Sequence, residues 1–114
     1  MIEGDRMISV TRGDTLPLEL EILKPDKTQY ELQEGDELVF TLKKEISVDS
    51  PIILQKKADS STGMYFELQP RETELDYGNY WFDVELTTSD KRRYTVIKPT
   101  KLKVTKEVTT HDES

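Results

Sequence analysis

Residues 76–86 of the chain read DYGNYWFDVEL, and this stretch joins a turn signal to a strand signal. Its second half alternates large apolar side chains with polar ones, which predicts a strand with one face in a hydrophobic core. The side chains expected to point inward are those of Tyr80, Phe82, Val84 and Leu86. We therefore predict that a strand begins at Gly78.

The residues Asp76, Gly78 and Tyr80 have the spacing of a tyrosine corner, which is typical of immunoglobulin-like sandwiches. In such a corner glycine permits the tight turn, and the tyrosine hydroxyl bonds to the backbone a few residues upstream. Phe82 stands where antibody domains carry their second cysteine, so an aromatic ring would replace the disulfide. The alternative interpretation is a plain turn before a strand.

Further short stretches with apolar alternation lie on both sides, separated by residues that favour turns. Strands are expected in residues 7–11, 16–22, 38–42, 52–57, 64–68 and 94–104, with a return segment at Tyr30 and Leu32 and a short helical turn in residues 70–75. Pro17 cannot donate to a ladder and indicates an edge or a bulge, and Pro99 is expected to interrupt the last strand. The pattern predicts an all-β fold, an immunoglobulin-like antiparallel β-sandwich of seven or eight strands.

The length of 114 residues fits one domain. We assign the sandwich to residues 7–106, a flexible N-terminus to residues 1–6 and a disordered tail to residues 107–114, which are mostly polar.

The composition excludes several classes of function. The chain has no cysteine and one histidine, His111 in the polar tail, so thiol catalysis and the usual zinc sites are excluded, and we expect neither a catalytic residue nor a cofactor. The net charge of −7 argues against nucleic-acid binding. Neither a membrane span nor a signal peptide is visible, so cytoplasmic synthesis is the default expectation. Glycosidases need two carboxylates that face a cleft, whereas paired acids such as Asp83 and Glu85 are expected on the solvent-exposed face of a strand.

Several segments resemble one group of proteins. They are residues 10–15 with Pro17 and Leu18, residues 34–44, residues 75–86, and residues 94–97 with Pro99. Together they are similar to small proteins of phages and prophages of Gram-positive bacteria, and to the N-terminal β-sandwich domain of phage baseplate upper proteins. The resemblance covers roughly residues 7–106 and implies a virion structural module of the tail or baseplate. Its implied partners are other virion proteins or further copies of the chain, and the assembled location would be the virion.

Trp81 has the parity opposite to the core positions of its strand, so it is expected to point outward. Other apolar residues share that outward parity in their own strands, namely Val39, Ile53, Tyr65 and Ile97. Those that lie on one sheet would form a second apolar patch, which is typical of an interface. Alternatively, loops cover these residues, or a bulge changes their register.

Residues 91–106 carry seven basic residues and no acid. We select four of the basic residues as candidate interface residues: Arg92, Arg93, Lys101 and Lys103. The first interpretation is that the segment pairs with acids on adjacent strands, Asp83 and Glu85 or Glu19 and Glu21. The second is that it meets the acidic face of another subunit.

The predicted function is therefore non-enzymatic: a virion module that binds other subunits. The alternative function is a monomeric module that binds a carbohydrate or another cell-surface ligand, with Trp81, Tyr65 and Tyr77 stacking on sugar rings.

Overall fold

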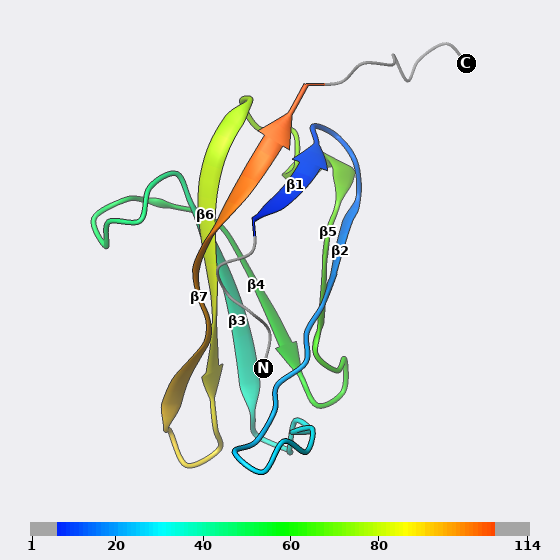
Figure 1. Cartoon of the computed structure of the whole chain (residues 1–114), viewed down its shortest axis with the longest axis vertical. Coiled ribbons are helices and arrows are strands. Elements are labelled where there is room, and N and C mark those ends of the chain that lie inside the picture. The colour runs from blue at the N-terminus through cyan, green and yellow to red at the C-terminus, as the bar shows by residue number, and fades with distance from the viewer. Residues whose placement is uncertain (1–6, 107–114) are drawn as a thin grey trace.

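The computed structural model describes residues 7–106, and this part of the chain is built almost entirely from β-strands (Figure 1). The strands are β1 (Ile8–Thr11), β2 (Leu16–Glu19), β3 (Glu37–Lys43), β4 (Ile52–Asp59), β5 (Tyr65–Leu68), β6 (Gly78–Thr87) and β7 (Arg93–Thr105). A 3-10 helix, η1 (Pro70–Glu72), forms the predicted helical turn. The expected flexible N-terminus and disordered tail, with His111, lie outside the described residues.

The strands form two sheets. The larger sheet has five strands in the order β1-β7-β6-β3-β4, and the smaller one consists of β2 and β5. The all-β prediction is confirmed, but the prediction of purely antiparallel pairing is wrong, because β1 runs parallel to β7 with Ile8 opposite Leu102. Alternation reveals which face of a strand is buried, not which strand lies beside it. After β1 the chain turns tightly, with the Asp14 amide donating to the Thr11 carbonyl at 3.0 Å, and it continues in the other sheet.

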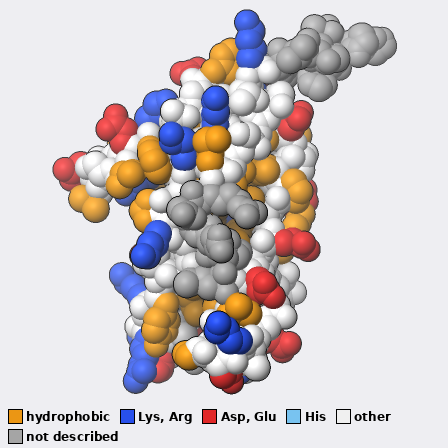
Figure 2. Space-filling view, in the orientation of Figure 1, with side chains coloured by type: hydrophobic (Ala, Val, Ile, Leu, Met, Phe, Trp, Pro, Cys, Tyr) orange, Lys and Arg blue, Asp and Glu red, His pale blue; other side chains and the backbone are white. Residues whose placement is uncertain are grey.

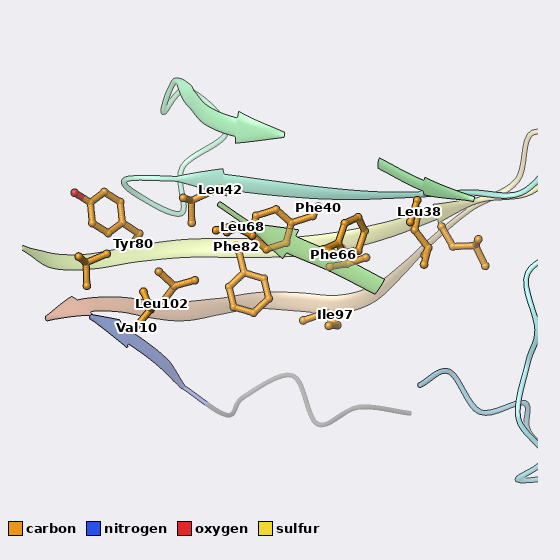
Figure 3. Packing of buried hydrophobic residues seen from close by; sticks show 14 residues of the cluster. Val10, Leu38, Phe40, Leu42, Phe66, Leu68, Tyr80, Phe82, Ile97 and Leu102 are labelled. Atoms are coloured by element: carbon orange, nitrogen blue, oxygen red, sulfur yellow. The ribbon is translucent and has the colours of Figure 1, made fainter. Parts of the chain in front are cut away.

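The core lies between the two sheets and consists of aliphatic side chains around a cluster of phenylalanine rings (Figure 3). Phe40 of β3 is fully buried, 5.3 Å from the ring centroid of Phe82 on β6 and 5.8 Å from that of Phe66 on β5. The predicted inward residues of β6, Tyr80, Phe82, Val84 and Leu86, are all buried. Alternation in β3, β5 and β6 therefore places three phenylalanines in one cluster that joins the sheets.

The last strand is continuous, which corrects the prediction of an interruption at Pro99. The register of β7 against β6 shifts instead: Phe82 lies opposite Thr100, whereas Val84 lies opposite Ile97. Proline has no amide to donate, and a bulge accommodates it without ending the strand. This shift reverses the parity of β7 at Ile97, and a second shift, between Val84 and Glu85, restores it. Ile97 is therefore buried in the core, and the prediction that it belongs to the outer face is wrong.

The segment between β2 and β3 is a loop and not a return strand. It contains one isolated bridge, between Leu23 and Gln29, and a buried acid at its end, Asp36. The Tyr30 hydroxyl donates to the Asp36 carboxylate, which also accepts the Gln33 amide at 2.8 Å. Side-chain hydrogen bonding to Asp36 thus orders this loop where the sequence suggested a ladder.

The contact between Tyr30 and Asp36 predicts a loss of stability at high pH. Burial, helped by the Asp36 carboxylate, raises the pKa of Tyr30 to about 12 from 10.0. The neutral phenol is the form the fold favours, so its contribution is complete below pH 10 and is lost as pH rises through 12. After allowance for solvent screening we expect a loss of about 1–2 kcal/mol. Urea denaturation between pH 10 and 12 should show this decline, and Tyr30→Phe should flatten it; equal slopes in both proteins would contradict the assignment.

Candidate functional site

The turn before β6 has the hydrogen bond that a tyrosine corner requires. The Tyr80 hydroxyl donates to the Asp76 carbonyl at 2.7 Å, and the ring is buried. Gly78 has a φ of 135°, which side-chain-bearing residues rarely adopt. The Lys44 Nζ lies 4.4 Å from the centre of the Tyr80 ring. The corner holds β6 in the register that exposes its alternate residues on the outer face.

The outer face of the five-stranded sheet unites most of the predicted interface residues. Trp81 is half-buried there, opposite Lys43 on β3 and Lys101 on β7. The Lys101 Nζ lies over the indole ring, 5.7 Å from its centre. The ladder puts three more predicted residues on this face or at its rim, namely Val39, Arg93 and Lys103, and the exposed Arg92 lies in the adjoining hairpin.

These residues do not form a continuous apolar patch, which corrects that prediction. Val39 is flanked by Glu85 on one side and Lys57 on the other. Ile53 is 40% exposed and lies at a register shift in β4, where Lys43 is opposite Ile52. Polar neighbours therefore separate the apolar residues of this face.

Tyr65 lies away from these residues, on β5 of the smaller sheet, and donates from its hydroxyl to Glu67 at 2.6 Å. That bond raises the pKa of Tyr65. Tyr65 therefore lies outside the patch that was expected of residues on one sheet, because β5 and β6 belong to different sheets.

The first interpretation of the basic segment, that it pairs with acids of adjacent strands, is wrong for the described residues. Within residues 7–106 its one ion pair joins Arg92 and Asp90 of the same hairpin, at 3.3 Å. The other six cations of the segment form no ion pair with a described acid; they are Lys91, Arg93, Lys98, Lys101, Lys103 and Lys106. The cause is geometric, since the ladder places Glu85 opposite Thr95 and leaves Asp83 beside the register shift.

A hollow of about 310 Å³ lies beside Trp81, and sequence reasoning missed it. We call it the Trp81 hollow; its lining comes from β3, β6, β7 and the loop of residues 44–51, with Thr41, Lys43, Glu45, Ile46, Val48, Trp81, Phe82, Asp83 and Pro99. The loop projects from the body, with hydrophobic side chains along it and at its base (Figures 1 and 2). Asp83 has no register partner on β7, because the shift at Pro99 falls opposite it.

Asp83 is the chemically unusual group of the hollow. Its carboxylate is partly buried and accepts no hydrogen bond from a described residue. Burial raises its pKa, the Glu85 carboxylate adds to the rise, and Lys43 opposes it. A carboxylate in this state can accept a hydrogen bond from a bound molecule at little further desolvation cost.

A second cavity, of about 100 Å³, lies between the sheets and has an almost wholly apolar lining that includes Leu18, Phe40 and Phe82. The polar residues of this lining are Glu19 and Thr100, and its other residues are apolar. Residues 7–106 contain no cluster of three or more histidine, cysteine, aspartate or glutamate side chains that could hold a metal ion.

The same part of the chain has no helix that could cross a bilayer. Comparison of the sequence with protein-family models gives no match, and comparison with curated proteins gives none.

Proposed function

We propose that the chain is a non-enzymatic structural module of a phage or prophage virion, associated with the tail or baseplate, and that it binds other virion subunits. The observation that carries the proposal is the set of cations on β7 that have no described acid as partner. Arg93, Lys101 and Lys103 lie on the outer face of the five-stranded sheet or at its rim. Unpaired like charges on one strand repel each other, and an acidic partner surface would relieve that repulsion.

We also propose that the sandwich is immunoglobulin-like. The bond between Tyr80 and Asp76 supports this fold, as does the strand order, with β2 and β5 in a separate sheet from the central pair β3 and β6. In this interpretation the outer face of the larger sheet is a broad, regular platform on which strands fix the spacing of the charges.

The partner surface is expected to be acidic, and another copy of the chain offers one. Asp83 and Glu85 of β6 lie on the same outer face as the β7 cations and form no ion pair with them. Two copies that face each other could place the cations of one against these acids of the other. Such contacts are sensitive to salt, because exposed charges are screened over roughly 8–10 Å at physiological ionic strength.

Charge reversal on β7 tests the association. Lys101→Glu combined with Lys103→Glu should weaken self-association about tenfold or more, because attraction to acids becomes repulsion. Static light scattering over a concentration series at low and high salt measures the effect. The matched control, Lys24→Glu with Arg71→Glu, has the same net charge but changes exposed residues away from β7. Equal association of both variants would contradict a role for β7.

The virion assignment has its own test. Mass spectrometry of particles purified from the host that encodes the chain should detect its peptides at a fixed ratio to the other tail proteins. Their absence from intact particles would contradict the assignment, whatever the protein does in isolation.

Carbohydrate binding is the second candidate function, but the structure places the candidate site differently from the sequence prediction. The three aromatic residues that suggested it do not form one platform, because Tyr65 belongs to the smaller sheet. Trp81 alone among them lines the Trp81 hollow, so this function now rests on the hollow and not on exposed aromatic rings.

A further inference from the structure

We propose that the Trp81 hollow binds one neutral hexose unit of a carbohydrate, an inference that rests on the second candidate function and names its ligand and its site. Its volume of about 310 Å³ is at the lower end of the range of small-molecule sites, roughly 300–1,000 Å³. The hollow is open at the surface and is lined only by described residues of three strands and one loop. It therefore fits a single ring and not an extended peptide.

The apolar part of the hollow suits the C–H face of a pyranose ring. Trp81 provides an indole, and Ile46, Val48 and Pro99 provide aliphatic walls. Ile46 and Val48 are 56% and 87% exposed, so a bound ring would cover apolar surface that is now wet. Lys101 lies over the indole from β7 and helps to fix its orientation.

The polar part of the hollow contains both acceptors and donors. Asp83 offers a carboxylate without a donor, and Lys43 offers an ammonium group. The Thr41 hydroxyl accepts from the Gln55 amide at 3.1 Å, which leaves its own proton free to donate. Sugar hydroxyls both donate and accept, so they match this mixture.

The mixed charges decide in favour of a neutral ligand. An anion would be repelled by Asp83 and Glu45, and Lys43 offsets part of the attraction that these two acids exert on a cation. A neutral polyol meets neither penalty, and its hydroxyls replace the water that the Asp83 carboxylate has partly lost.

The chain contains a single tryptophan, so the indole reports on the hollow directly. The experiment titrates the full chain with the methyl glycosides of glucose, galactose, mannose and N-acetylglucosamine at millimolar concentrations. It follows the indole N–H and the backbone amides by two-dimensional NMR. We expect a saturable shift of the Trp81 indole with at least one glycoside.

Two variants separate the site from its surroundings. Asp83→Ala should weaken binding about tenfold or more, since hydrogen bonds to a charged acceptor are lost. Glu74→Ala is the control, because it removes an exposed acid that does not line the hollow, and affinity should be unchanged. The backbone spectrum checks that both variants remain folded.

Three results would overturn the proposal. The first is that no glycoside shifts the indole signal. The second is that Asp83→Ala binds the glycoside as tightly as the unaltered chain does. The third is that the indole signal shifts with protein concentration and not with sugar, which would mean that a protein contact occupies the hollow. Light scattering of the same samples shows whether the chain self-associates, which separates a failure of sugar binding from a failure of the proposed assembly.

Discussion

Replacing Phe40 by alanine is expected to lower the free energy of unfolding by roughly 3–5 kcal/mol. The ring is fully buried and contacts the rings of Phe66 and Phe82, so truncation leaves a cavity at the junction of the two sheets. The surrounding strands can close the cavity only in part, because their hydrogen-bonded ladders fix the backbone positions. A domain of this size has little stability to spare, so the variant should be partly unfolded at physiological temperature.

Urea denaturation followed by circular dichroism measures this loss. Tyr65→Ala is the control, because it removes an exposed aromatic ring and should change stability by only about 0.5 kcal/mol. Phe40→Leu should fall between the two. A loss below about 1 kcal/mol for Phe40→Ala would mean that the phenylalanine cluster does not hold the sheets together.

Gly35→Ala is expected to cost roughly 2–4 kcal/mol, from two sources that add. Gly35 has a φ of 93°, which strains any residue with a Cβ. An added Cβ would also lie 2.6 Å from the Cβ of Ser89, in the hairpin between β6 and β7. The loop that precedes β3 would have to move away from that hairpin, and with it Asp36 and its bonds to Tyr30 and Gln33.

Gly63→Ala is a matched control for the backbone term. Gly63 has a similar φ of 80°, but no atom lies within 4 Å of an added Cβ. Its loss should be about 1 kcal/mol, which is the conformational cost alone. Chemical denaturation of both variants gives the difference, which measures the contact with Ser89. Equal losses would show that the loop and the hairpin do not touch as described.

The sequence was informative wherever one strand face is buried and the other is wet. In β3 and β6 the alternation of large apolar residues correctly predicts which side chains enter the core, since each strand is regular along its length. The turn from Asp76 to Tyr80 could also be predicted from the sequence, because a corner is made by residues close together in the chain. Local patterns of this kind require no knowledge of the neighbouring strand.

The rest depended on pairings between distant segments. Neither the sequence of β1 nor that of β7 indicates that the two strands pair in parallel. Pro99 indicated an irregularity in the last strand, but not that the irregularity would be a register shift. That shift buries Ile97 and leaves Asp83 without a register partner on β7. The Trp81 hollow was therefore unpredictable, since it requires the shift, the outward parity of Trp81 and the path of residues 44–51 together.

The parallel ladder between β1 and β7 also sets when folding can finish during synthesis. Ile8 pairs with Leu102, so the first strand has no ladder partner in its sheet until nearly the whole described chain has left the ribosome. Contacts between segments so far apart form slowly, because a long loop must close before they stabilise anything. Until then the edge of β1 is open to pairing with other nascent chains. The short length of β1, four residues, limits that hazard.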